Sequence, residues 1–251
     1  QFRLFLISCW TVTMNKLFIF VLFTFAKCAF GDEALLSPCA HEDSECIRRN
    51  TEKFLDRTSA GIPEYDVRPI DPLLLGHVEY SNPESDVVLH FKNIRITGLK
   101  KLNINQFSMN IDTRAVYLQA KIDVNIVANL TVEFKQLSKF VTDSYRAKTG
   151  VVLMTSMYNY NLVPNDKGVE FYEVGPETIT CEAIDLPEVT VGSAIFNDPE
   201  TNSRKRVYQT KLQDFRKQAV CKILSAAYVN VIHNIRATAK ILPKTSFFTD
   251  V

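Results

Sequence analysis

Residues 116–134 alternate between apolar and polar side chains, and this pattern restricts the possible folds more than any other in the chain. Every even position is apolar, and the odd positions are polar or amphipathic except Val127. A period of two predicts a strand with one buried face and one face in water. A straight strand of this length would extend roughly 60 Å, so we expect it to curl around another part of the chain.

A long helix near the C-terminus is the expected partner of this strand. Residues 198–205 are polar and loop-like, and no glycine or proline follows them until Pro243. The pattern predicts one helix of roughly 30 residues, about 45 Å long. The predicted fold class is therefore α+β, a highly curved antiparallel sheet wrapped around one long C-terminal helix. The apolar side chains of this helix recur at spacings of three and four residues: Leu212, Phe215, Ala219, Ile223, Ala226, Ala227, Val231 and Ile235.

Shorter segments complete the prediction. A helix capped by Asp43 or Ser44 is expected to end before Gly61, and its narrow apolar stripe indicates that it lies on the body of the protein. The turn residues 165–168 predict a hairpin. Short turns between successive strands indicate a meandering antiparallel sheet in a single domain. Segments rich in β-branched and aromatic residues predict strands at 77–80, 87–96, 102–111, 150–160, 169–174 and 179–184.

Residues 14–31 have the form of a secretory signal peptide. Lys16 precedes an apolar run, and small residues end the segment at Gly31. Cleavage there would start the mature chain at Asp32, so we expect residues 32–251 to form a single domain. We interpret residues 1–13, which precede Met14, as untranslated sequence that was read through. The alternative is an uncleaved membrane anchor, because residues 2–12 are also rather apolar.

Removal of this leader leaves four cysteines, Cys39, Cys46, Cys181 and Cys221. An even number in a secreted chain predicts two disulfides, and three pairings are possible. We favour a short local pair, Cys39–Cys46, and a second pair, Cys181–Cys221, which would join a strand to the long helix. Asn129 begins the single glycosylation sequon of the mature chain. It occupies an outward position of the long strand, so a glycan there would point into solvent.

The residues carry no catalytic or nucleic-acid-binding pattern. The chain has 29 basic and 28 acidic residues and a net charge of +1, which gives no reason to expect nucleic acid or an anionic membrane as a partner. It lacks the sequence motifs of serine hydrolases, phosphate-binding loops and zinc proteases. We therefore expect no metal or cofactor. The four histidines are scattered, without the spacing of metal ligands: His41, His77, His90 and His233.

The ends of a sheet rolled around a helix are natural positions for apolar cavities, because the helix does not fill them. Candidate lining residues are Phe54 of the short helix, the inward faces of the later strands, and Phe247 and Phe248. Such an aromatic cluster fits either a filled core or a ligand pocket. The residues alone indicate room for an apolar ligand without naming it.

Short motifs along the whole expected mature chain resemble those of the insect haemolymph juvenile hormone-binding proteins, within the takeout superfamily of carriers. The paired Cys39 and Cys46 point to the superfamily, and the second cysteine pair and the C-terminal motifs point to the hormone-binding branch. The motifs are Leu36-Ser37-Pro38-Cys39, Gly61-Ile62-Pro63-Glu64-Tyr65-Asp66, Pro69-Ile70-Asp71-Pro72, Phe91-Lys92-Asn93, Ile96-Thr97-Gly98-Leu99, Pro176-Glu177-Thr178, His233-Asn234-Ile235-Arg236-Ala237 and Ser246-Phe247-Phe248.

The resemblance implies a sheet rolled around a helix, a hormone pocket at one end and a lid formed by the first helix, here near residues 44–59. It places Tyr158 on the epoxide oxygen of the hormone, and Phe54, Tyr172 and Phe247 in the pocket wall. Tyr172 departs from the phenylalanine expected at its position. A buried phenol is a suitable donor for an epoxide, which is a weak acceptor.

The implied function is a secreted, non-enzymatic and monomeric carrier of juvenile hormone in haemolymph, without nucleic-acid partners or stable membrane association. One alternative is a takeout-like carrier of another terpenoid or of a fatty acid. Another is a structural or interaction protein with a filled core and no ligand. An esterase that consumes the hormone is disfavoured, because the chain lacks a nucleophile motif.

Overall fold

The computed structural model describes residues 35–81, 86–200 and 212–251. By its internal contacts the chain divides into two units, residues 1–34 and residues 35–251. The expected leader at 14–31 and residues 1–13 therefore lie outside the described residues, as does part of the loop expected at 198–205. None of the described helices combines the length and apolarity needed to cross a membrane.

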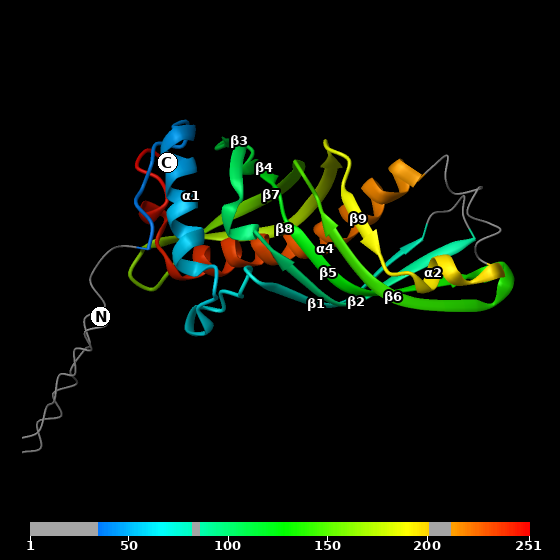
Figure 1. The fold of residues 1–251 in the computed structure, drawn as a ribbon. Coiled ribbons are helices and arrows are strands. Elements are labelled where there is room, and N and C mark those ends of the chain that lie inside the picture. Colours follow the sequence, from blue (N-terminus) through cyan, green and yellow to red (C-terminus); the bar gives the residue numbers. More distant parts are fainter. Residues whose placement is uncertain (1–34, 82–85, 201–211) are drawn as a thin grey trace, which may run out of the picture. The chain divides into compact units, whose positions relative to one another are not determined.

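In the described parts of residues 35–251, nine strands form two antiparallel sheets (Figure 1). The five-stranded sheet has the order β1-β2-β5-β6-β9 and the four-stranded sheet the order β3-β4-β7-β8. The strands of the first sheet are β1 (Leu73–Ser81), β2 (Val87–Thr97), β5 (Asn125–Phe134), β6 (Lys139–Lys148) and β9 (Glu188–Val191). Those of the second are β3 (Asn103–Asn110), β4 (Ala115–Ile122), β7 (Val152–Pro164) and β8 (Glu170–Ala183).

The alternating stretch forms two strands, so the prediction of one strand over residues 116–134 was wrong. The chain leaves the four-stranded sheet after β4 and enters the five-stranded sheet at β5. At the corner the Val124 amide donates to the Thr149 hydroxyl at 3.0 Å, and the Thr149 amide donates to the Val124 carbonyl at 3.1 Å. Gly98 also approaches this corner with a φ of 108°, and a Cβ there would lie 3.0 Å from the Asp123 carbonyl oxygen.

The inward face nevertheless continues through the corner, since every even position from Val116 to Phe134 is buried. The side chain of Val124, at the break, is completely buried. A strand of this length cannot follow the curvature of the roll as one flat ribbon. It changes sheet instead and keeps its apolar face toward the core.

The predicted long helix is confirmed as α4 (Leu212–Ile241), which has 30 residues. It runs lengthwise between the sheets and packs most closely against β8 (Figure 1). A wide apolar surface of this helix is buried, including the fully buried Val220, Ile223 and Leu224. The Cys181–Cys221 disulfide ties β8 to α4, as expected from the sequence. The sheet-around-helix fold is therefore confirmed.

The predicted short helix is confirmed as α1 (Ser44–Thr58). The Asp43 side chain caps it by accepting a hydrogen bond from the Cys46 amide at 3.0 Å. Its apolar stripe buries Phe54 and Leu55, together with Thr58. The Cys39–Cys46 disulfide joins the segment before the helix to its first turn, again as expected. Helix α1 lies beside β3, at the end of the fold where the chain also terminates (Figure 1).

Four further elements differ from the sequence prediction. Strand β6 was missed because most of its side chains are at least partly exposed, and β9 was missed because it has four residues. Strand β8 is continuous where two strands were predicted. Gly175 and Pro176 lie in a bulge opposite Asn159, where a proline does not interrupt the hydrogen-bond ladder. A short helix, α2 (Ala194–Asn197), follows β9.

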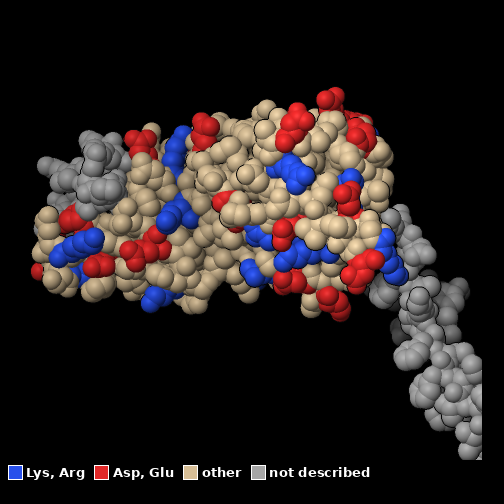
Figure 2. Space-filling model, turned by 180° about the vertical axis from the view of Figure 1, so that it is seen from behind, with Lys and Arg blue, Asp and Glu red and all other residues tan. Residues whose placement is uncertain are grey.

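Charged side chains are mixed in sign on the face that Figure 2 shows. Lysine and arginine side chains alternate with aspartate and glutamate, and broad uncharged areas lie between them. No continuous basic surface crosses this view. This face therefore has no electrostatic feature suited to a polyanion.

Candidate functional site

A cavity of about 190 Å³ lies at the α1 end of the roll. One buried water occupies roughly 10–15 Å³ in the same measure, so this space is large enough for an organic molecule. The wall is overwhelmingly apolar. Its residues come from α1, β3, β4, β7, β8, α4 and both ends of the described chain, and include Leu36, Ile47, Phe54, Leu55, Ile104, Phe107, Met109, Val116, Leu118, Tyr158, Tyr160, Tyr172, Val174, Tyr228, Val231, Ile235, Phe247 and Phe248.

Helix α1 covers the cavity together with the C-terminal segment. The Cys39 amide donates to the Phe247 carbonyl at 3.1 Å, and the Thr249 amide donates to the Cys39 carbonyl at 2.9 Å. Because Cys39 is also bonded to Cys46 of α1, the cover and the C-terminus form one connected unit. Phe107 of β3 stacks against Phe248 with 6.1 Å between ring centroids.

The same cover is held by a polar contact at its edge. The Asp250 carboxylate accepts from the His41 amide at 2.9 Å and lies 3.0 Å from His41 Nδ1. These contacts, the backbone hydrogen bond first, hold the pKa of Asp250 below its ordinary value. Charge-assisted bonds of this kind stabilise the ionised carboxylate. The contact joins residues that are 209 positions apart in the sequence.

The structure brings the four residues predicted to contact ligand to this one cavity. Phe54 reaches it from α1, Tyr158 from β7, Tyr172 from β8 and Phe247 from the segment after α4. Tyr158 follows the inward alternation of β7, in which the even positions from Val152 to Tyr160 are buried. Tyr172 packs edge-on against Tyr160, Phe247 and Phe248. The side chain of Asn129, the predicted glycosylation site, is exposed.

Most polar groups of the wall are already hydrogen-bonded within the protein. The Asn234 side chain bonds both backbone groups of Arg68 at 2.8 Å. The Thr238 hydroxyl donates to the Asn234 backbone carbonyl, and the side-chain amide of Asn50 donates to the Ser37 backbone carbonyl. These groups stabilise the wall and leave little polarity for a ligand.

Tyrosine hydroxyls are the exception. Those of Tyr172 and Tyr228 are shut off from solvent and bond to none of the described residues. The hydroxyls of Tyr158 and Tyr160 also form no hydrogen bond within the described chain, and neither is among the sealed ones. Burial raises the pKa of Tyr158, so the phenol remains protonated and is a hydrogen-bond donor at neutral pH.

Tyr228 is one of several residues of the cavity wall that the sequence interpretation did not single out. Its position continues the three- and four-residue spacing of apolar side chains in the long helix, and that spacing indicates a buried residue and no more. The ring is almost completely buried, and burial raises the pKa of its hydroxyl. Ser156 lies nearby, but the Ser156 hydroxyl is directed at the Leu118 carbonyl at 3.4 Å, and no hydrogen bond of good geometry joins the two side chains.

The chain has a rolled antiparallel sheet that encloses both a long helix and an apolar cavity. This architecture is that of a class of proteins that bind small apolar molecules inside the roll. The chain belongs to the haemolymph juvenile hormone binding protein family, whose model matches residues 18–158. It is 39% identical over 223 residues to the juvenile hormone-binding protein of Manduca sexta, with 87% of this chain and 97% of that protein covered.

The fold also matches a solved structure of low sequence similarity, Takeout 1 from Epiphyas postvittana. The TM-score is 0.71 at 16% identity, and the match covers 85% of this chain and 100% of that one. At this identity the likeness shows the fold alone. It confirms the takeout-like arrangement of antiparallel sheets with a long C-terminal helix.

Proposed function

We propose that this protein is a carrier that binds juvenile hormone, a sesquiterpenoid epoxide ester, in the cavity under α1. The observation that carries the proposal is an apolar cavity of about 190 Å³ whose wall includes the buried Tyr158 phenol, which bonds to none of the described residues. Family membership and the likeness to the Manduca sexta protein support this choice of ligand. Apolar burial supplies most of the affinity in such a site, and a few polar groups supply orientation.

Tyr158 is proposed to donate a hydrogen bond to the epoxide oxygen of the hormone. Phe54 and Phe247 are proposed to close the pocket over the hydrocarbon chain, and Tyr172 to add its ring to the wall. A phenol that stays protonated is a donor at all physiological pH values. Without a ligand the Tyr158 hydroxyl is a buried donor without a partner, and an acceptor in the cavity removes that cost.

The proposed role is transport without chemical conversion. The described residues that line the cavity include no histidine, carboxylate, lysine or arginine. Cys39 is held in a disulfide. Ester or epoxide hydrolysis needs a nucleophile activated by a nearby base, and the described wall offers no such base. A carrier that returns its ligand unchanged agrees with these residues.

Secretion into haemolymph is proposed for the same protein. The two disulfides suit an oxidising extracellular compartment. We propose that cleavage of residues 14–31 yields a single hormone-binding domain of residues 32–251 that acts as a monomer without membrane association. Asn129 is proposed as its glycosylation site, because its exposed position on β5 directs a glycan away from the core.

The test is equilibrium binding of labelled juvenile hormone to residues 32–251, with the variants Tyr158→Phe and Tyr145→Phe. Tyr145→Phe is the matched control, since the Tyr145 hydroxyl is also buried and bonds to none of the described residues, and its ring packs on Phe91, outside the cavity wall. Loss of one buried hydrogen bond, about 1–2 kcal/mol, weakens binding by Tyr158→Phe roughly 5- to 30-fold. The control should bind like the unmodified protein.

Two results would change the proposal. Tight binding that Tyr158→Phe leaves unaltered retains the carrier and removes the assigned donor. Absence of hormone binding by protein shown to be folded and oxidised rejects juvenile hormone. It favours a takeout-like carrier of another terpenoid or a fatty acid, and solvent extraction of the purified protein followed by mass spectrometry would identify that ligand.

A further inference from the structure

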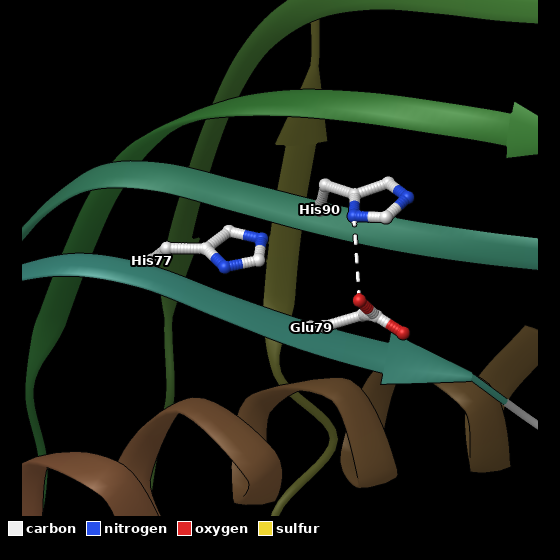
Figure 3. Close-up of side chains that lie close together, drawn as sticks. All are labelled: His77, Glu79 and His90. Carbon is white, nitrogen blue, oxygen red and sulfur yellow. Dashed lines mark ion pairs between the residues drawn. The ribbon is translucent and has the colours of Figure 1, made fainter.

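Two of the four histidines, His77 and His90, lie side by side on the outer surface of the five-stranded sheet. His77 and Glu79 lie two positions apart on β1, so their side chains share one face. His90 of β2 is the direct cross-strand partner of Glu79. Figure 3 shows the three side chains together, with an ion pair between His90 Nδ1 and a Glu79 oxygen at 3.7 Å.

Glu133 of β5 fixes the orientation of the His90 ring. One of its carboxylate oxygens lies 2.9 Å from His90 Nε2. An ionised carboxylate only accepts hydrogen bonds, so Nε2 carries the hydrogen and donates it. Nδ1 is therefore the ring nitrogen left to act as a ligand, and a Glu79 carboxylate oxygen lies 3.7 Å from it.

We propose that His77, Glu79 and His90 form a binding site for a borderline divalent transition-metal ion, Zn²⁺ in the first place, with Glu133 as the residue that orients His90. One donor atom from each of the three residues lies within 4.8 Å of the other two. In a tetrahedral site, two ligand atoms bound to one zinc at roughly 2.0–2.1 Å lie about 3.4 Å apart, so side-chain rotations that shorten the separations between donor atoms by up to about 1.4 Å complete the site. The near-parallel histidine rings, 5.9 Å apart, are both on the solvent side.

The donor set selects the class of metal. Two imidazoles and one carboxylate suit zinc, copper or nickel, whereas magnesium and calcium prefer oxygen donors alone. Three protein ligands leave a fourth tetrahedral position for water. A carboxylate that accepts a hydrogen bond from the other ring nitrogen commonly orients a metal-binding histidine, and Glu133 lies in this position relative to His90. Because β1 is an edge strand of its sheet, a bound ion would fasten this edge to β2.

The proposal is tested by titrating Zn²⁺ into residues 32–251 prepared without a histidine tag, at pH 7.5, by isothermal calorimetry. We expect one ion per chain. His77→Gln and His90→Gln are expected to weaken binding at least tenfold, and Glu133→Gln about tenfold, the usual effect of removing an orienting carboxylate. His233→Gln removes a histidine that lies on α4 and contacts the Asp66 carbonyl, so it is the matched control.

Further measurements separate a built site from general zinc binding. Zn²⁺ should raise the melting temperature of the unmodified protein and of His233→Gln, but not that of His90→Gln. Ca²⁺ and Mg²⁺ should produce neither heat nor a shift in melting temperature. Absence of Zn²⁺ binding up to about 1 mM would overturn the proposal. Equal binding by the control and by both cluster-histidine variants, all shown to be folded by circular dichroism, would overturn it as well.

Discussion

Replacing Tyr228 with phenylalanine is expected to stabilise the ligand-free protein. The hydroxyl is sealed inside the roll and bonds to none of the described residues. A buried polar group without a partner costs about 1–3 kcal/mol, and phenylalanine keeps the ring while removing that group. The small void left by the missing oxygen offsets part of the gain. We therefore expect the free energy of unfolding to rise by about 1 kcal/mol.

Urea unfolding of oxidised residues 32–251 at pH 7 measures this change, and the slope m should stay constant. For a chain of this size 1 kcal/mol corresponds to a rise in melting temperature of about 2–4 °C. Tyr80→Phe is the matched comparison, because the Tyr80 hydroxyl donates to Gln218 Oε1 at 2.5 Å. That variant should lose about 0.5–1 kcal/mol. Hormone affinity should stay within about twofold in Tyr228→Phe, since its hydroxyl is closed off from the cavity.

A destabilisation of Tyr228→Phe equal to that of Tyr80→Phe would refute this reasoning. It would show that the Tyr228 hydroxyl has a partner in solution, and Ser156 is the nearest candidate. The double variant Tyr228→Phe with Ser156→Ala would then reveal the coupling between the two side chains. Additive effects would exclude Ser156 as that partner.

Three further predictions concern pH and the disulfides. Burial raises the pKa of the core tyrosines, so the folded protein keeps protons that the unfolded chain releases at high pH. The free energy of unfolding should therefore fall as the pH rises above about 10. The urea midpoint, measured as a function of pH, should fall less steeply for Tyr172→Phe than for the unmodified protein. Contacts with His41 lower the pKa of Asp250, so they stabilise the folded protein above the ordinary pKa of aspartate, and this stabilisation is lost as the pH falls below about 4. The melting temperatures of the unmodified protein and of Asp250→Asn should differ at pH 6 and converge near pH 2. A difference that stays constant with pH would contradict this. The Cys181–Cys221 bridge spans 40 positions, so the double serine variant should lose about 4 kcal/mol in urea unfolding, and a loss below about 1 kcal/mol would refute the loop-entropy argument.

The sequence predicted local elements well wherever one pattern persisted over many residues. The three- and four-residue spacing of apolar side chains predicted a helix of roughly 30 residues where the structure has α4. The capping residues Asp43 and Ser44 predicted where α1 begins. It failed where an element has no such pattern. Strand β6 is exposed on much of its length, and β8 passes through Gly175 and Pro176, which normally end a strand. In both cases neighbouring strands supply the hydrogen bonds that local propensity does not.

The candidate site was predictable only in part. The resemblance to a known family singled out Phe54, Tyr158, Tyr172 and Phe247, and the fold brings them to one cavity. It did not reveal which hydroxyls are closed off and which one faces the cavity. That distinction depends on side chains from several elements packing around each oxygen, and no spacing within one element records it.

Periodicity by itself determined which faces of the chain are buried and that a curved sheet encloses a helix. These properties follow from local geometry, since the direction of a side chain repeats every two residues in a strand and every 3.6 in a helix. Only the tertiary structure decided that the long alternating stretch divides between two sheets, that His41 meets Asp250, and that the scattered His77 and His90 become neighbours. Strand register brings His77 and His90 together, and register is fixed by the packing of the whole core. Docking of the C-terminal segment on Cys39 brings Asp250 to His41.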